Sequence, residues 1–188
     1  MALRMHLTAM GRGVFRVLNN MRSITKFIAV LSLVVFASSI AFGQTSLSSL
    51  SGGQIDVQGQ RGKVVILAMG ASWLPLSKNQ AEYTNVLAKR YSGKDVVVYF
   101  VATDSTNAKS KNYATNADIE KFVAASKLAV PVLRDSDGTL TVKKFNVDQL
   151  PSFIILDKQG NVSGASFGGI DPKFDITVPI SKAVDRLL

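Results

Sequence analysis

Residues 63–77, which read KVVILAMGASWLPLS, decide the fold of this 188-residue chain. The first seven residues form a continuous apolar run, and such short runs are typical of a buried central strand. A turn follows, and Pro75 suits the first position of a helix, where its missing N–H needs no partner. Apolar residues then recur at helical spacing up to Tyr91, and Gly93 marks the end of the helix. The stretch predicts a strand, a tight turn and a helix.

The chain beyond this stretch continues the alternation of strands and helices. Strands are expected over residues 95–102, 130–134 and 152–156, with residues 161–167 as the hairpin partner of the last; helices are expected over residues 115–127 and 139–145 and from Pro179 to the end. Thr115 and Asp118 have the spacing of a capping box. Strands linked by helices pair in parallel, whereas the hairpin adds antiparallel strands. We therefore predict an α/β fold of three layers, with a mixed central sheet flanked by helices.

The first part of the chain has the pattern of a secretory signal peptide, which we assign to residues 1–43. Arg22 and Lys26 supply positive charge ahead of the apolar residues 27–37. Residues 41–43 (AFG) place small side chains at the −3 and −1 positions of a cleavage site. An uncleaved anchor is the competing interpretation, but the apolar run is shorter than the ~20 residues that a spanning helix needs. We expect an exported protein, periplasmic or secreted, without membrane attachment after cleavage.

The domain organisation that follows is simple. Met21 is a possible alternative start of the chain. Residues 44–60 are rich in Ser, Gly and Gln and are predicted to form a flexible lead-in with one weak strand near residues 54–57. Residues 61–188 are predicted to form one globular domain.

Composition removes several classes of function. The net charge of +9 includes five basic residues of the predicted leader, and the remaining 17 basic and 13 acidic residues leave +4, which gives no reason to expect nucleic-acid binding. The chain has no cysteine, so it has no thiolate and no disulfide framework. Its single histidine, His6, lies in the predicted leader. We therefore predict no metal site and no cofactor.

Four stretches of the sequence together resemble a known family. They read GKVVILAMGASW (62–73), DVVVYFVATD (95–104), VPVLRDSDGTL (130–140) and FNVDQLPSFIILDKQGNV (145–162). Their order and spacing resemble the TlpA-like and redoxin branch of exported thioredoxin-fold proteins, over about residues 50–188. The resemblance implies a thioredoxin-like fold, with thiol–disulfide oxidoreductase activity in the parent family.

The resemblance also locates a degenerate active site. The family carries Trp-Cys-x-x-Cys at the turn between strand and helix, and this chain has Trp73, Leu74, Pro75, Leu76 and Ser77 there. The cis-proline that lies beside the active site in the family matches Pro151, which follows Leu150. The tryptophan and both prolines are kept, but both sulfur atoms are absent.

This replacement removes the chemistry of the parent family. A low-pKa thiolate must attack a disulfide, and a second thiolate must resolve the mixed disulfide. Leu74 has no nucleophile, and the hydroxyl of Ser77 forms no disulfide. The sequence therefore predicts a pseudo-oxidoreductase that is not an enzyme and that binds a peptide or protein of the cell envelope at the groove around Trp73, Leu74, Leu76 and Pro151.

Alternative interpretations remain for single residues and for the whole chain. Trp73 is either a core aromatic or an exposed aromatic at the rim of a peptide-binding groove. Ser77 is either a nucleophile without a visible base or, as we prefer, a serine that caps the helix start. Asp135 and Asp137 indicate a β-turn more than a calcium loop, because the other acids of such a loop are missing. The alternative functions are a structural scaffold that uses another surface, such as the polar loop 103–117, and an enzyme of a different class.

Overall fold

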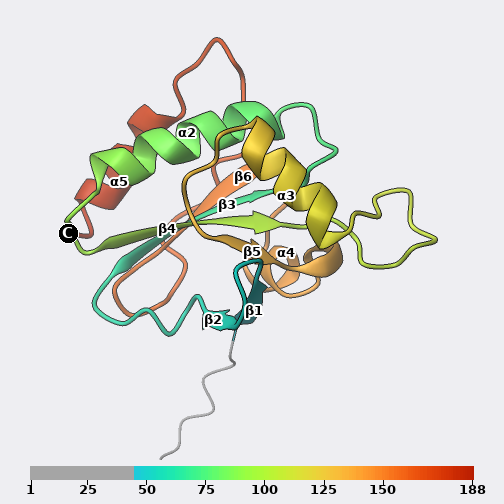
Figure 1. The fold of residues 1–188 in the computed structure, drawn as a ribbon. Helices are drawn as coiled ribbons and strands as arrows, with labels where there is room; N and C mark the ends of the chain where they lie inside the picture. The colour runs from blue at the N-terminus through green and yellow to red at the C-terminus, as the bar shows by residue number, and fades with distance from the viewer. Residues whose placement is uncertain (1–44) are drawn as a thin grey trace, which may run out of the picture. The chain divides into compact units, whose positions relative to one another are not determined.

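The structure, a computed structural model, describes residues 45–188, so the predicted signal peptide at residues 1–43 lies outside the described residues. The strands are β1 (Ser46–Ser49), β2 (Gln54–Asp56), β3 (Val64–Gly70), β4 (Val96–Ala102), β5 (Val132–Arg134) and β6 (Ser152–Leu156); the helices are α2 (Ser77–Arg90), α3 (Asn116–Ala125), α4 (Thr141–Lys144), α5 (Thr177–Asp185) and the 3-10 turn η1 (Ser136–Gly138) (Figure 1). No helix in residues 45–188 is both long and apolar enough to span a bilayer.

The strands form one mixed sheet in the order β2-β1-β5-β4-β3-β6. Strands β3, β4 and β5 run parallel, whereas β6 pairs antiparallel with β3, and β1 pairs antiparallel with β5 and β2. Strand β3 is buried along its whole length, as expected for a continuous apolar run flanked by strands on both sides. The predicted mixed central sheet is confirmed.

Helices cover the two faces of this sheet unequally, which gives three layers (Figure 1). On one face Leu87 of α2, Ile119 of α3 and Ile180 of α5 pack with Ile66 of β3. On the other face the neighbouring Leu67 packs in a second apolar cluster. This cluster includes Phe145, the C-cap residue of α4. The alternation of side chains along each strand explains why adjacent residues of β3 belong to different clusters.

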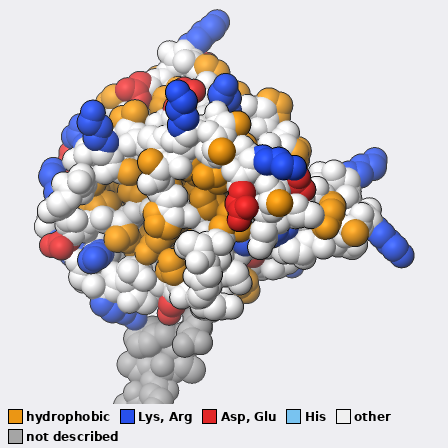
Figure 2. Space-filling model, viewed as in Figure 1, with side chains coloured by type: hydrophobic (Ala, Val, Ile, Leu, Met, Phe, Trp, Pro, Cys, Tyr) orange, Lys and Arg blue, Asp and Glu red, His pale blue; other side chains and the backbone are white. Residues whose placement is uncertain are grey.

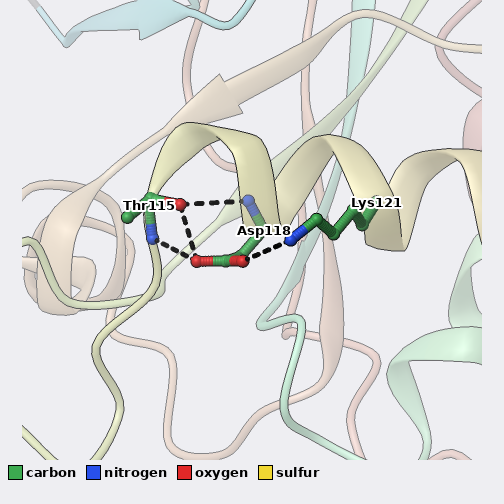
Figure 3. Close-up of polar contacts among 3 residues, drawn as sticks. All are labelled: Thr115, Asp118 and Lys121. Atoms are coloured by element: carbon green, nitrogen blue, oxygen red, sulfur yellow. Dashed lines mark hydrogen bonds and ion pairs between the residues drawn. The ribbon is translucent and has the colours of Figure 1, made fainter.

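The capping box predicted at the start of α3 is confirmed (Figure 3). The Oγ1 atom of Thr115 accepts the N–H of Asp118 at 3.1 Å, and the carboxylate of Asp118 accepts the N–H of Thr115 at 3.1 Å. The hydroxyl of Thr115 and the ammonium of Lys121 also donate to this carboxylate. These hydrogen bonds stabilise the ionised form and therefore lower the pKa of Asp118, the hydroxyl of Thr115 contributing most.

A buried tyrosine joins the C-terminal ends of α2 and α5. The hydroxyl of Tyr91 lies 2.8 Å from a carboxylate oxygen of Asp185 and 3.1 Å from the carbonyl oxygen of Ser181, and Arg90 donates to Asp185 at 3.0 Å. Burial raises the pKa of Tyr91. The hydrogen bond from Tyr91, followed by the one from Arg90, lowers the pKa of Asp185. The two helices thus end together at the edge of the sheet opposite to the start of α2.

The prediction of a flexible lead-in at residues 44–60 is wrong. Residues Ser46–Ser49 and Gln54–Asp56 form a hairpin, and β1 also pairs with β5. Only the weak strand near residues 54–57 was expected. Leu47 is buried in the same apolar cluster as Leu133 of β5, which anchors a strand that is otherwise polar. The partner of β1 lies far along the chain, which is why local composition gave no sign of the pairing.

Three predicted boundaries also differ from the structure. Residues 161–167 form two isolated bridges to β6 in place of a continuous strand, with Gly164 at φ +77° between them. Helix α2 begins at Ser77, after Pro75 has formed part of the preceding turn. Helix α5 begins at Thr177, so Pro179 lies in its first turn, where backbone N–H groups need no helical partner.

Candidate functional site

The turn between β3 and α2 presents a row of apolar side chains at the helix N-terminus. The N–H of Leu74 donates to the carbonyl of Ala71 at 3.1 Å, and the N–H of Ser77 donates to the carbonyl of Leu74 at 3.0 Å. The side chain of Trp73 is 50% exposed, whereas Leu74 and Leu76 are half-buried. Trp73 is therefore exposed and the core-aromatic interpretation is wrong, while its role at the rim of a peptide-binding groove stays a prediction.

Ser77 is fully buried beneath this turn. Its hydroxyl oxygen accepts the N–H of Ala71 at 3.2 Å, so it links the first residue of α2 to the residue that follows β3. Ser77 is thus a helix-start serine that caps a backbone donor, as preferred from the sequence, but the donor is Ala71 of the turn, and α2 itself has no side-chain cap. Within the described residues, no titratable side chain hydrogen-bonds to Ser77, so the structure provides no base that could activate its hydroxyl.

A buried amide that the sequence-based predictions missed, Gln80, supports the site from inside. The Nε2 atom of Gln80 donates to the carbonyl of Met69 at 3.1 Å and to that of Ser152 at 2.7 Å. Gln80 thus connects α2 to the ends of both β3 and β6. Its Oε1 atom has no hydrogen-bond partner in residues 45–188, and a Cβ atom at Gly70 would lie only 2.4 Å from it. The available signal was the spacing of Ser77 and Gln80, three residues apart on one helix face.

A buried carboxylate holds the other side of the turn. Asp104 follows β4, and its oxygens accept the N–H of Ser72 at 3.0 Å and the hydroxyl of Ser72 at 2.6 Å. Asp104 is fully buried. An acid directly after a buried strand was the sequence signal for this contact, because the carboxyl ends of parallel strands meet at one edge of a sheet.

The proline loop lies next to the turn at the same edge of the sheet. The bond between Leu150 and Pro151 is cis, as the resemblance implied. Met69 pairs with Ser152 in the antiparallel register, so Pro151 comes one position beyond this pair, level with Gly70. The main-chain N–H and C=O of Leu150 have no hydrogen-bond partner among the residues that the structure describes. The structure therefore brings all seven predicted site residues to one edge of the sheet.

The acids at residues 135 and 137 belong to a turn, as preferred from the sequence. Asp135 is 3% exposed, and its carboxylate accepts the N–H groups of Leu140 and Thr141 at 3.1 and 2.6 Å. Asp137 accepts the hydroxyl of Ser105 at 3.0 Å. The protein itself thus engages both carboxylates. Residues 45–188 contain no cluster of three His, Cys, Asp or Glu side chains that could hold a metal ion.

Comparison with protein families identifies the group to which this arrangement belongs. A profile of the AhpC/TSA family matches residues 41–165, which is more than half of the chain. The chain belongs to the AhpC/TSA family. The recognition of the chain as a thioredoxin-like redoxin protein is thereby confirmed.

Known proteins agree with this assignment. The thiol-disulfide oxidoreductase ResA of Bacillus cereus is 27% identical over 116 residues, which cover 62% of this chain and 61% of that protein. A secreted Mycobacterium tuberculosis disulfide oxidoreductase superposes with a TM-score of 0.58 at 22% identity, covering 77% of this chain and 96% of that one. The exposed lipoprotein thioredoxin Etrx1 of Streptococcus pneumoniae gives a TM-score of 0.60 at 24% identity, with coverages of 77% and 99%. These likenesses confirm the thioredoxin-like fold.

The composition of the chain limits the chemistry that this turn can offer. It contains no cysteine, so the positions at the N-terminus of α2 hold Leu74 and Ser77. Aligned N–H groups at a helix N-terminus lower the pKa of a thiol placed there, but leucine has no group that titrates. What remains is an apolar surface made by Trp73, Leu74 and Leu76, next to the unpaired main chain of Leu150. We call these four residues the turn surface.

Proposed function

We propose that this protein is a redox-inactive member of the AhpC/TSA family that binds extended peptide segments at the turn surface. The observation that carries the proposal is the half exposure of Trp73 beside two partly buried leucines. Apolar and aromatic side chains exposed together in this way are typical of the centre of an interaction surface.

The unpaired main chain of Leu150 suggests how a peptide would be held. An extended segment can add to such a position by donating to its carbonyl and accepting its N–H, as in strand addition. The leucines would then contact the side chains of the bound segment. Gln80 and Asp104 hold β3, β6 and the turn in fixed relation, so little ordering would be needed on binding.

We also propose that the protein acts outside the cytoplasm. The support is the predicted signal peptide at residues 1–43 and the likeness to a secreted disulfide oxidoreductase and to an exposed lipoprotein thioredoxin. Fractionation of cells that express the chain with a C-terminal tag tests this directly. Export predicts a tagged product shortened by about the length of the leader, while a full-length product in the cytoplasm would contradict it.

The binding proposal can be tested with the intrinsic fluorescence of the protein, because Trp73 is its only tryptophan. Peptides selected from a random ten-residue display library on the purified protein would be synthesised and titrated while the emission of Trp73 is followed. We expect saturable changes in emission and loss of binding in the Leu74→Asp, Leu76→Asp double variant. Val86→Asp is the matched control, since Val86 is 52% exposed on α2 away from the turn.

The outcomes separate the proposed functions. Both variants must keep the melting temperature of the parent protein. If the double variant does not fold, Trp73→Ala replaces it, and binding is then followed by the fluorescence anisotropy of a labelled peptide. Equal binding by the parent and the double variant would move binding to another surface. Failure to enrich any peptide would favour the scaffold interpretation.

A further inference from the structure

One edge of strand β4 is left unpaired at the end of the sheet opposite to the turn surface. The N–H of Val64 donates to the carbonyl of Asp95, and the N–H of Phe100 donates to that of Pro131. These bonds fix the alternation along β4: odd-numbered residues turn their main-chain groups to β3, and even-numbered residues turn theirs to β5. The N–H and C=O of Val98 therefore point to the side of β5.

Strand β5 is too short to meet these groups. Its register with β4 begins only at Phe100. The residue that would donate to the carbonyl of Val98 is Pro131, which has no N–H. Within residues 45–188 the main-chain N–H and C=O of Val98 consequently have no hydrogen-bond partner. Unpaired strand edges of this kind are templates for the addition of another strand.

An apolar hollow of about 320 Å³ lies along this edge. Its walls come from the end of α2, the first half of β4 and the segment that leads into β5, and they include Ala88, Tyr91, Val96, Val98, Ala129 and Pro131. Figure 2 shows the corresponding apolar surface between α2 and β4, facing the viewer. The side chain of Asn85 fixes the outer wall, since it accepts the N–H of Ala129 and donates to the carbonyl of Lys127.

Basic residues outnumber acids on the segments that line the hollow and next to them. Lys89, Arg90 and Lys94 are exposed on the segment that forms one wall, and Lys127 is exposed beside the other. The acid of these segments is Asp95; Asp185 lies on α5 and already accepts hydrogen bonds from Tyr91 and Arg90. The rim thus has an excess of positive charge, which favours a ligand with carboxylates.

We propose that this slot binds an extended segment of a partner protein by strand addition at Val98, with apolar side chains in the hollow and acidic side chains at the rim. The unpaired main chain selects an extended conformation, the apolar walls select the inward side chains, and the lysines select carboxylates. About four strand residues, which span ~13 Å, would fill the slot. The site is separate from the turn surface, because the 14 residues of α2, ~21 Å long, lie between them.

A fluorescein-labelled peptide of alternating valine and glutamate, eight residues long, is a suitable probe for the purified protein. Two matched peptides serve as controls. One alternates valine and lysine, and the other keeps valine and glutamate but carries N-methyl groups on the backbone nitrogens along one edge of the extended peptide. We expect saturable binding of the valine–glutamate peptide by fluorescence anisotropy and at least tenfold weaker binding of both controls. The amide hydrogen of Val98 should exchange more slowly in the complex.

Variants of the protein locate the site. Ala129 is exposed, so Ala129→Trp fills the hollow with little expected effect on folding, and it should weaken binding at least tenfold. Lys94→Glu should also weaken binding, whereas Lys111→Glu makes the same charge change on the distant polar loop and should not. The Leu74→Asp, Leu76→Asp variant should bind normally, which separates this site from the turn surface.

Three results would overturn the proposal. The first is the absence of binding at millimolar peptide, and the second is equal binding of the N-methylated peptide or by the Ala129→Trp variant. The third is self-association of the protein that Ala129→Trp abolishes, because a second copy would then occupy the slot.

Discussion

Two cysteines placed at the turn should form a disulfide, since the structure keeps the geometry that such a bond needs. The N–H of Ser77 donates to the carbonyl of Leu74 at 3.0 Å. A hydrogen bond between residues three apart closes a turn with its outer Cα atoms within ~7 Å. Disulfides join residues whose Cα atoms are ~4.4–6.8 Å apart. The variant Leu74→Cys, Ser77→Cys should therefore oxidise without movement of the backbone.

The expected stabilisation follows from the size of the closed loop. For a loop of about four residues, the loss of chain entropy in the unfolded state corresponds to ~2 kcal/mol at 25 °C. For a domain of about this size, this free energy raises the melting temperature by ~4–8 °C. Both redox forms carry the same substitutions, so the difference between them isolates the cross-link from any loss of packing at Leu74.

Thermal unfolding followed by circular dichroism, with and without dithiothreitol, measures this difference. A thiol count confirms the disulfide, and turbidity of insulin reports reductase activity. Ser77 is buried and Leu74 is half-buried, so iodoacetamide should alkylate position 74 first in the reduced protein. Leu74→Ser is the matched control, because it places a short polar side chain there without a thiol. If the double-cysteine variant still has two free thiols after treatment with oxidised glutathione, the turn does not keep the geometry of a disulfide site, and the reasoning is refuted.

Three further predictions concern the contacts that support the site and the fold. Gln80→Leu should lower the free energy of unfolding by ~2 kcal/mol in urea titrations, because the carbonyls of Met69 and Ser152 lose their buried donor; an unchanged midpoint would contradict this. Thr115→Ala should cost ~1 kcal/mol through loss of the cap of α3, which equal urea midpoints would exclude. The pKa of Asp185 is lowered in the folded state, so its contribution is present above ~pH 4, the unfolded value, and is lost as the pH falls through the folded value. Asp185→Asn should therefore show a shallower loss of stability below pH 4 than the parent, and parallel curves would refute this.

Local sequence patterns determined the elements whose stability depends on near neighbours. The apolar runs at residues 63–69, 95–102 and 152–156 became buried strands, since their side chains can only be removed from water between two layers. The spacing of Thr115 and Asp118 defined the start of α3, because both partners of the capping box lie within four residues. The absence of cysteine, and with it of any thiolate, needed no structure at all.

Only the tertiary structure decided the features that join distant segments. Ser48 and Ser49 of β1 pair with residues of β5 more than 80 positions later, and no local pattern indicates such a partner. The exposure of Trp73 depends on how β3, β6 and Asp104 hold the turn, so the sequence left two interpretations open. The unpaired edge at Val98 exists because β5 begins only at Val132, after Pro131. Sequence determines the preference of each segment, but the contacts between segments decide which main-chain and side-chain groups remain free to bind.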